Sequence, residues 1–130
     1  MKVMIGIGCD RGVSLQTLQE ALAQALVEGG LDASAVAGLA SIDKKQDEHA
    51  LLQLAQENAW PLHFYPAEAL AQIPVPNPSP VVLKYMGTPA VAEAAALKAA
   101  NTDMRHLLVE KYKYLGADGK NATVSIARMK

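Results

Sequence analysis

Short apolar runs that alternate with segments of helical periodicity are the feature that most constrains this fold. Residues 3–7 are apolar and end at a glycine, as a buried strand does. Leucines then recur at helical spacing, opposite a face of glutamine and glutamate: Leu15, Leu18, Leu22 and Leu26. Ser14 is placed to cap this helix, and Gly29 and Gly30 are placed to end it. A strand followed at once by a helix is the opening unit of an α/β fold.

The same alternation continues along the chain. Further strands are expected at residues 36–42, 61–65 and 81–86, and helices at residues 47–58, 66–70 and 88–100. The last of these helices should start with Thr88 as N-cap and Pro89 at the first helical position. Residues 106–114 and 122–128 predict a closing pair of antiparallel strands around an Asp118–Gly119 turn.

These elements predict a single α/β domain over residues 1–130. Its sheet should be mixed but mostly parallel, with helices packed on its faces and a C-terminal antiparallel strand pair. Residues 73–80 contain four prolines and cannot form regular structure. At eight residues, with a strand expected directly after it, this segment is interpreted as a loop inside the domain.

The charge balance excludes several classes of partner. Twelve Lys and Arg against 13 Asp and Glu give a net charge of −1, which favours neither nucleic acid nor an anionic membrane. Aromatic residues make up 5%, which argues against a base-stacking surface. Apolar stretches are interrupted before the roughly 18 residues of a membrane span, and the N-terminus lacks the long apolar region of a signal peptide. A cytoplasmic protein is expected.

The first candidate site is the glycine-rich segment of residues 6–12. Gly8 and Gly12 let the backbone approach a ligand, the following helix start attracts anions, and Arg11 can clamp a carboxylate or phosphate. The spacing matches neither a dinucleotide fingerprint nor a P-loop. The alternative is a tight turn with Arg11 in solvent.

Cys9 lies near the same helix start, where a thiol can become a nucleophile. His49, His63 and His106 have no recognisable spacing to it, so a packed, inert thiol is favoured. The scattered Cys and His residues also argue against zinc. We predict no metal and no cofactor.

Charged residues follow the second expected strand, where open α/β sheets bind ligands. Residues 42–48, with two adjacent lysines before Asp47 and Glu48, are the candidate segment there, and a charged helix start without a ligand is the alternative. Glu93 is the one acid in an alanine-rich segment and is a candidate if it faces inward rather than toward solvent. Lys111 alternates with tyrosines on a late strand, where a solvated, lysine-bearing edge is the alternative.

In this order, the segments 6–12, 42–48, 77–79, 87–97 and 123–128 resemble the CobE/CbiG C-terminal domain family of cobalamin (vitamin B12) biosynthesis. The resemblance implies Lys45 rather than Lys44 as the lysine of the second motif. It also implies Asp47, Glu48, Asn77, Ser79, Glu93 and Lys111. We take Lys45, Glu48 and Glu93 as the catalytic candidates. The ligand-binding candidates are Gly8, Cys9, Arg11, Gly12, Asp47, Asn77, Ser79, Gly87, Thr88 and Lys111. Asp10 departs from the family pattern, which often has a basic residue there.

The resemblance implies a role in corrin metabolism. In larger members, this domain is the C-terminal part of a hydrolase that opens the lactone ring of cobalt-precorrin 5A and releases acetaldehyde. The chain resembles the stand-alone, CobE-like form, so we expect it to bind a precorrin or corrinoid intermediate as a carrier or accessory protein. Other corrin-pathway enzymes are expected as further partners. Corrin precursors carry many carboxylates, which Arg11, Lys45 and helix starts near Gly12 and Thr88 would match.

Two alternatives stay open. One is a precorrin hydrolase, in which Glu48 or Glu93 would be the base and Lys45 or Arg11 the oxyanion partner. The other is a generic regulatory module that binds small acids.

Overall fold

The computed structural model describes residues 1–76, 78 and 90–130. The strands are β1 (Val3–Cys9), β2 (Val36–Ile42), β3 (Leu62–Tyr65), β4 (Leu107–Leu115) and β5 (Asn121–Arg128). The helices are α1 (Leu15–Glu28), α2 (His49–Glu57), α3 (Ala67–Ala71) and α5 (Val91–Ala100), with short 3-10 turns η1 (Ala33–Ala35), η2 (Asp43–Lys45) and η3 (Met104–His106). The strand expected at residues 81–86 lies outside the described residues.

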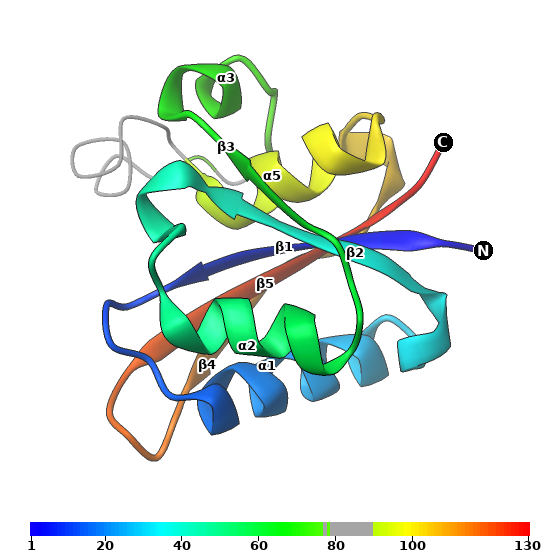
Figure 1. Cartoon of the computed structure of the whole chain (residues 1–130). Helices are drawn as coiled ribbons and strands as arrows, with labels where there is room; N and C mark the ends of the chain where they lie inside the picture. The colour runs from blue at the N-terminus through cyan, green and yellow to red at the C-terminus, as the bar shows by residue number, and fades with distance from the viewer. Residues whose placement is uncertain (77, 79–89) are drawn as a thin grey trace.

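The strands form a mixed sheet in the order β3-β2-β1-β5-β4 (Figure 1). β1 pairs in parallel with β2, and β2 pairs in parallel with β3. β5 is antiparallel to both of its neighbours, β1 and β4. The mixed sheet with a C-terminal antiparallel pair is therefore confirmed. β4 lies at the edge of the sheet, where lysines are expected.

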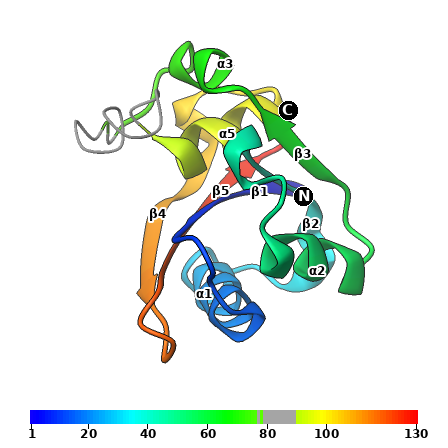
Figure 2. The same cartoon turned by 60° about the vertical axis from the view of Figure 1, so that its left-hand side comes forward.

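Helices cover both faces of this sheet. α1 and α2 lie on one face, and α5 and α3 lie on the other (Figures 1 and 2). Successive side chains of β1 point alternately toward the helices on the two faces of the sheet. Val3, Ile5 and Ile7 pack in the core under α1 and α2, whereas Met4 packs with residues of α5.

α5 lies against β1 more closely than any side chain at Gly6 would permit. A Cβ atom at position 6 would lie 1.9 Å from the Ala92 carbonyl oxygen and 2.8 Å from the Ala96 backbone nitrogen. The small residues of α5 are buried against the sheet, among them Ala94, Ala95 and Ala96. This close approach fixes the helix that carries Glu93.

Two predicted helix starts are wrong. α5 begins at Val91 after an extended Ala90 (φ −158°, ψ 114°), so Pro89 is not its first helical residue. The helix instead begins where Val91 and Ala92 reach the glycines of β1. α2 begins at His49 rather than residue 47, because the carboxylates before it bond to another loop.

The close contact at Gly6 predicts that a side chain there destabilises the protein, and Gly8, on the same face of β1, provides the control. Gly6→Ala should lower the free energy of unfolding by about 3 kcal/mol or more, because the backbone of α5 must move. At Gly8 an added Cβ would have the Val91 Cβ as its nearest neighbour, at 3.8 Å, so Gly8→Ala should cost less than about 1 kcal/mol. Urea unfolding of both variants checks this, and equal losses would contradict it.

Candidate functional site

The candidate residues of the first two motifs lie beyond the carboxyl ends of the parallel strands β1 and β2. β1 ends at Cys9 and β2 ends at Ile42, and the two strands are parallel neighbours. The loops that follow them carry Arg11 and Gly12 on one side and Lys45 to Glu48 on the other. Figure 2 turns this side of the molecule toward the viewer. The two loops therefore meet beyond the carboxyl ends of β1 and β2, the place where open α/β sheets bind ligands.

Arg11 joins the two loops through its guanidinium group. Its Nη1 lies 2.7 Å from Asp47 Oδ1, and its Nη2 donates to the Lys44 carbonyl oxygen at 3.1 Å. Glu48 Oε2 is 3.8 Å from the same Nη1. The hydrogen bond and charge of Arg11 hold the pKa of Asp47 below its ordinary range. Arg11 thus stays 59% exposed, as in the alternative of a turn with Arg11 in solvent, but its guanidinium is bonded to the second loop.

Glu48 fills the anion position predicted at Gly12. The Gly12 N–H donates to Glu48 Oε1 at 3.0 Å and to Oε2 at 3.4 Å. Glu48 is only 5% exposed and stands just before α2 as its N-cap residue. The backbone donor that was expected to meet a ligand carboxylate therefore meets one of the protein's own carboxylates.

The structure distinguishes the two adjacent lysines of the second motif. Lys45 is 5% exposed, whereas Lys44 is exposed. Over residues 1–76, 78 and 90–130, no ion pair of the Lys45 ammonium is present. Its charge nevertheless acts on Cys9, which places the two side chains in one electrostatic neighbourhood.

Cys9 packs as a partly buried thiol against the core under α1 and α2. Burial raises the pKa of this thiol from 9.0 to about 11, with Lys45 opposing the shift and Glu48 adding to it. The favoured interpretation of an inert thiol agrees with this environment.

Glu93 and Lys111 form a separate pair on the α5 side of the sheet. Glu93 is fully buried, and its Oε1 lies 3.5 Å from Lys111 Nζ, whose side chain is 19% exposed. The solvent-facing alternative for Glu93 is therefore wrong. The pair connects α5 with the edge strand β4, whereas Glu48 bonds to the loop after β1. The two carboxylates thus serve different parts of the sheet.

Four predicted ligand-binding residues, Asn77, Ser79, Gly87 and Thr88, lie outside the described residues. The sequence reasoning missed another group, the carboxylates that tie the β4–β5 turn to this edge. Asp10 accepts from the Asn121 N–H at 2.7 Å, and Asp118 accepts from the Ser14 N–H at 2.9 Å. Bonds from the Lys120 and Ser14 N–H groups hold the pKa of Asp118 at about 2. The Asp–Gly pair marked a turn, but its sequence carried no signal for a partner in a loop 104 residues away.

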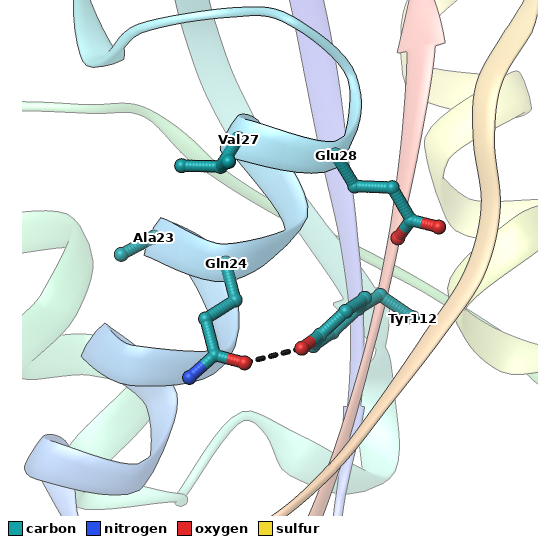
Figure 3. Close-up of a pocket in the computed structure, with 5 residues that line it drawn as sticks. All are labelled: Ala23, Gln24, Val27, Glu28 and Tyr112. Atoms are coloured by element: carbon teal, nitrogen blue, oxygen red, sulfur yellow. Dashed lines mark hydrogen bonds between the residues drawn. The ribbon is translucent and has the colours of Figure 1, made fainter.

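A groove lies elsewhere on the molecule, between α1 and β4. It has a volume of about 420 Å³ and is lined by Ala23, Gln24, Val27, Glu28 and Tyr112 (Figure 3). The Tyr112 hydroxyl donates to Gln24 Oε1 across it. None of the predicted site residues lines this groove.

The described part of the chain has neither a metal-ligand cluster nor a helix that could span a membrane. Residues 1–76, 78 and 90–130 contain no group of three or more His, Cys, Asp or Glu side chains able to hold a metal ion. In the same residues, no helix combines the length and the apolar character that a membrane crossing requires.

Cys9 offers a direct test of the charged surroundings at this edge. Glu48→Gln should lower the pKa of the thiol and Lys45→Gln should raise it, because each removes one of the charges acting on Cys9. The pH dependence of alkylation, or of thiolate absorbance, measures both shifts. Asp103→Asn, which removes a carboxylate paired with Arg105 instead, should leave the pKa unchanged. Equal pKa values in all four proteins would contradict the arrangement.

The raised thiol pKa also predicts how stability depends on pH. Between about pH 9 and 11 the unfolded thiol ionises while the folded thiol stays protonated. The Cys9 contribution to stability is therefore complete below pH 9 and lost as the pH rises toward 11. Urea unfolding should show a fall over this interval that is smaller in Cys9→Ala.

Comparison with known proteins identifies the family. Residues 3–127 match the family model described as "Cobalamin synthesis G C-terminus". The chain is 32% identical over 123 residues to a cobalt-precorrin-5A hydrolase of Priestia megaterium. This alignment covers 95% of the chain but only 31% of the hydrolase. It is 33% identical over 111 residues to Protein CobE of a Sinorhizobium species, covering 84% of the chain and 71% of that protein.

Solved structures give the same result. The crystal structure of CobE, from the cobalamin biosynthetic pathway, matches with a TM-score of 0.80 and 35% identity, over 99% of this chain and 91% of that one. The cobalamin biosynthesis protein chiG of Agrobacterium tumefaciens matches with a TM-score of 0.69 and 25% identity, over 98% of each chain. This chain therefore belongs to the cobalamin synthesis G C-terminal family and is a cobalamin biosynthesis protein.

Proposed function

We propose that this protein binds a precorrin or corrinoid intermediate and acts as a carrier or accessory protein. The observation that carries the proposal is the buried residue Lys45 after the carboxyl end of β2, with Arg11 on the neighbouring loop after β1. We place the protein in the cytoplasm, where it would exchange its ligand with other corrin-pathway enzymes.

The burial of Lys45 supports an acidic ligand. Lys45 is 5% exposed as a residue, so little of its side chain reaches water, and burial of a cation is costly unless an anion or hydrogen-bond acceptors face it. The described residues supply no ion pair to Lys45. A carboxylate on the ligand would provide the missing partner, and the acetate and propionate groups of corrin precursors are carboxylates.

The states of the candidate catalytic groups support binding over hydrolysis. A general base must reach a proton on water or substrate. Glu48 already accepts from the Gly12 N–H and is 5% exposed, and Glu93 is fully buried beside Lys111. With a pKa of about 11, Cys9 stays protonated near neutral pH. The described residues thus offer no exposed nucleophile with a positioned base.

Hydrolysis is the second candidate because of one specific observation, the 32% identity to the cobalt-precorrin-5A hydrolase. This chain spans about a third of that protein, 31% of its length. In this alternative, Glu48 or Glu93 would act as base and Lys45 or Arg11 would stabilise the oxyanion. The same arrangement of charges could then serve turnover.

Binding can be tested by adding the purified protein to precorrin intermediates. We expect an absorbance change that saturates at a stoichiometric ratio of protein to ligand. Lys45→Gln should weaken binding about tenfold or more, because it removes a charge-assisted hydrogen bond.

Lys44→Gln is the matched control for that variant. It removes the same charge one residue earlier, from an exposed side chain, and keeps the carbonyl that accepts from Arg11. It should bind about as well as the unmodified protein. If no intermediate produces an absorbance change, the proposed function is overturned. If Lys45→Gln and Lys44→Gln lose affinity equally, Lys45 has no special role in binding.

Turnover separates the two candidates. Catalytic amounts of the protein, incubated with excess cobalt-precorrin 5A, should leave the substrate mass unchanged if the protein only binds. Product detected by mass spectrometry, and lost in Glu48→Gln or Glu93→Gln, would establish the hydrolase instead.

A further inference from the structure

Arg11 already makes the contacts that a ligand carboxylate would make. Its Nη1 lies 2.7 Å from Asp47 Oδ1, a separation typical of a charge-assisted hydrogen bond. The Asp47 carboxylate therefore stands where an acidic ligand would bind. The sequence suggested that both residues contact the ligand, but two groups paired with each other cannot both do so without a change.

We propose that Asp47 competes with the acidic ligand for Arg11, and that binding exchanges the Asp47 carboxylate for a carboxylate of the ligand. The inference rests on the proposed function and assigns opposite effects to the two residues. Arg11 strengthens binding, whereas Asp47 weakens it and restricts it to ligands with enough negative charge to displace it.

Exposure makes this pair exchangeable. The side chains of Arg11 and Asp47 are 59% and 74% exposed, so water can solvate both partners when they separate. Exposed pairs of this kind contribute little to stability, and breaking one therefore opposes ligand binding only weakly. Glu48 differs, because its side chain is 7% exposed and the Gly12 N–H holds it.

Two further contacts keep Arg11 in place when Asp47 leaves. The Lys44 carbonyl oxygen accepts from Nη2 at 3.1 Å, and Glu48 Oε2 remains 3.8 Å from Nη1. The guanidinium would thus stay near the strand ends with one N–H free for the ligand. The bond from Arg11 Nη2 to the Lys44 carbonyl also holds the guanidinium against the backbone of the residue next to Lys45. A ligand with several carboxylates can therefore engage both cations.

Only molecules in which Arg11 is separated from Asp47 can bind the ligand carboxylate at Arg11, so the apparent affinity is reduced in proportion to that fraction of molecules. Removing Asp47 should then strengthen binding without adding a contact. The probe for this test is cobyrinic acid, a corrin with free carboxylates, and its methyl ester serves as the uncharged counterpart. Asp47→Asn should raise the affinity for the acid about twofold to fivefold, the range that exposed ion pairs allow. It should not change the affinity for the ester.

Arg11→Gln completes a double-mutant cycle. In the Arg11→Gln background, Asp47→Asn should not change the affinity for the acid any further, because the residue for which Asp47 competes is gone. Asp103→Asn is the matched control for lost negative charge. Asp103 forms an exposed pair with Arg105 at 2.8 Å, with side chains 53% and 83% exposed, outside the site. This variant should bind like the unmodified protein.

A readout independent of affinity follows the Asp47 carboxyl by nuclear magnetic resonance. Arg11 depresses its pKa in the free protein, so saturation with the acid should return that pKa toward its ordinary value. The ester should leave it depressed.

The outcomes separate this inference from the proposed function. If the unmodified protein binds the acid but Asp47→Asn binds equally or more weakly, the competition is refuted while the proposed function stands. An equal gain in Asp103→Asn also refutes it, since the gain would reflect net charge alone. If the unmodified protein binds a precorrin intermediate but not the acid, the competition is refuted for this ligand class; if it binds neither, the proposed function fails and the competition fails with it.

Discussion

The contact between α5 and β1 at Gly6 is the constraint on which one whole layer of the structure depends. The Ala92 carbonyl oxygen lies where a Cβ of residue 6 would be, so the helix can rest on the strand backbone only if this residue is glycine. The alanines of α5 serve the same close approach. Once the helix is seated, Glu93 is buried and meets Lys111 of β4, which connects the helix to the far edge of the sheet.

Carboxylates join the loops at the carboxyl ends of β1 and β2 and the nearby β4–β5 turn. Glu48 bonds to the Gly12 N–H, Asp10 to the Asn121 N–H and Asp118 to the Ser14 N–H. In each case an acidic side chain accepts from a backbone N–H in a loop or at the end of an element. The loops after β1 and β2 and the β4–β5 turn are thereby fixed before any ligand arrives. Lys45 and Arg11 are the cations that this framework presents.

The sequence predicts the elements well but the pairing of side chains poorly. Apolar alternation located β2 at residues 36–42, and Ser14 was identified correctly as the cap of α1. Both depend on local order in the chain. The start of α5 is set by packing on β1, and the Asp118 bond spans 104 residues, so neither leaves a local pattern. Family resemblance, not periodicity, selected Lys45 over Lys44, and the structure shows Lys45 buried and Lys44 exposed.

The strand order has a consequence for the chain as it is synthesised. Of the described strands β1 is made first, and β2 can join one of its edges early. Its other edge is covered by β5, the last strand described. While the ribosome still holds residues 121–128, the central strand of the sheet has open backbone donors and acceptors on that side. A nascent chain at this stage presents an edge that a chaperone, or a second unfinished chain, can pair with.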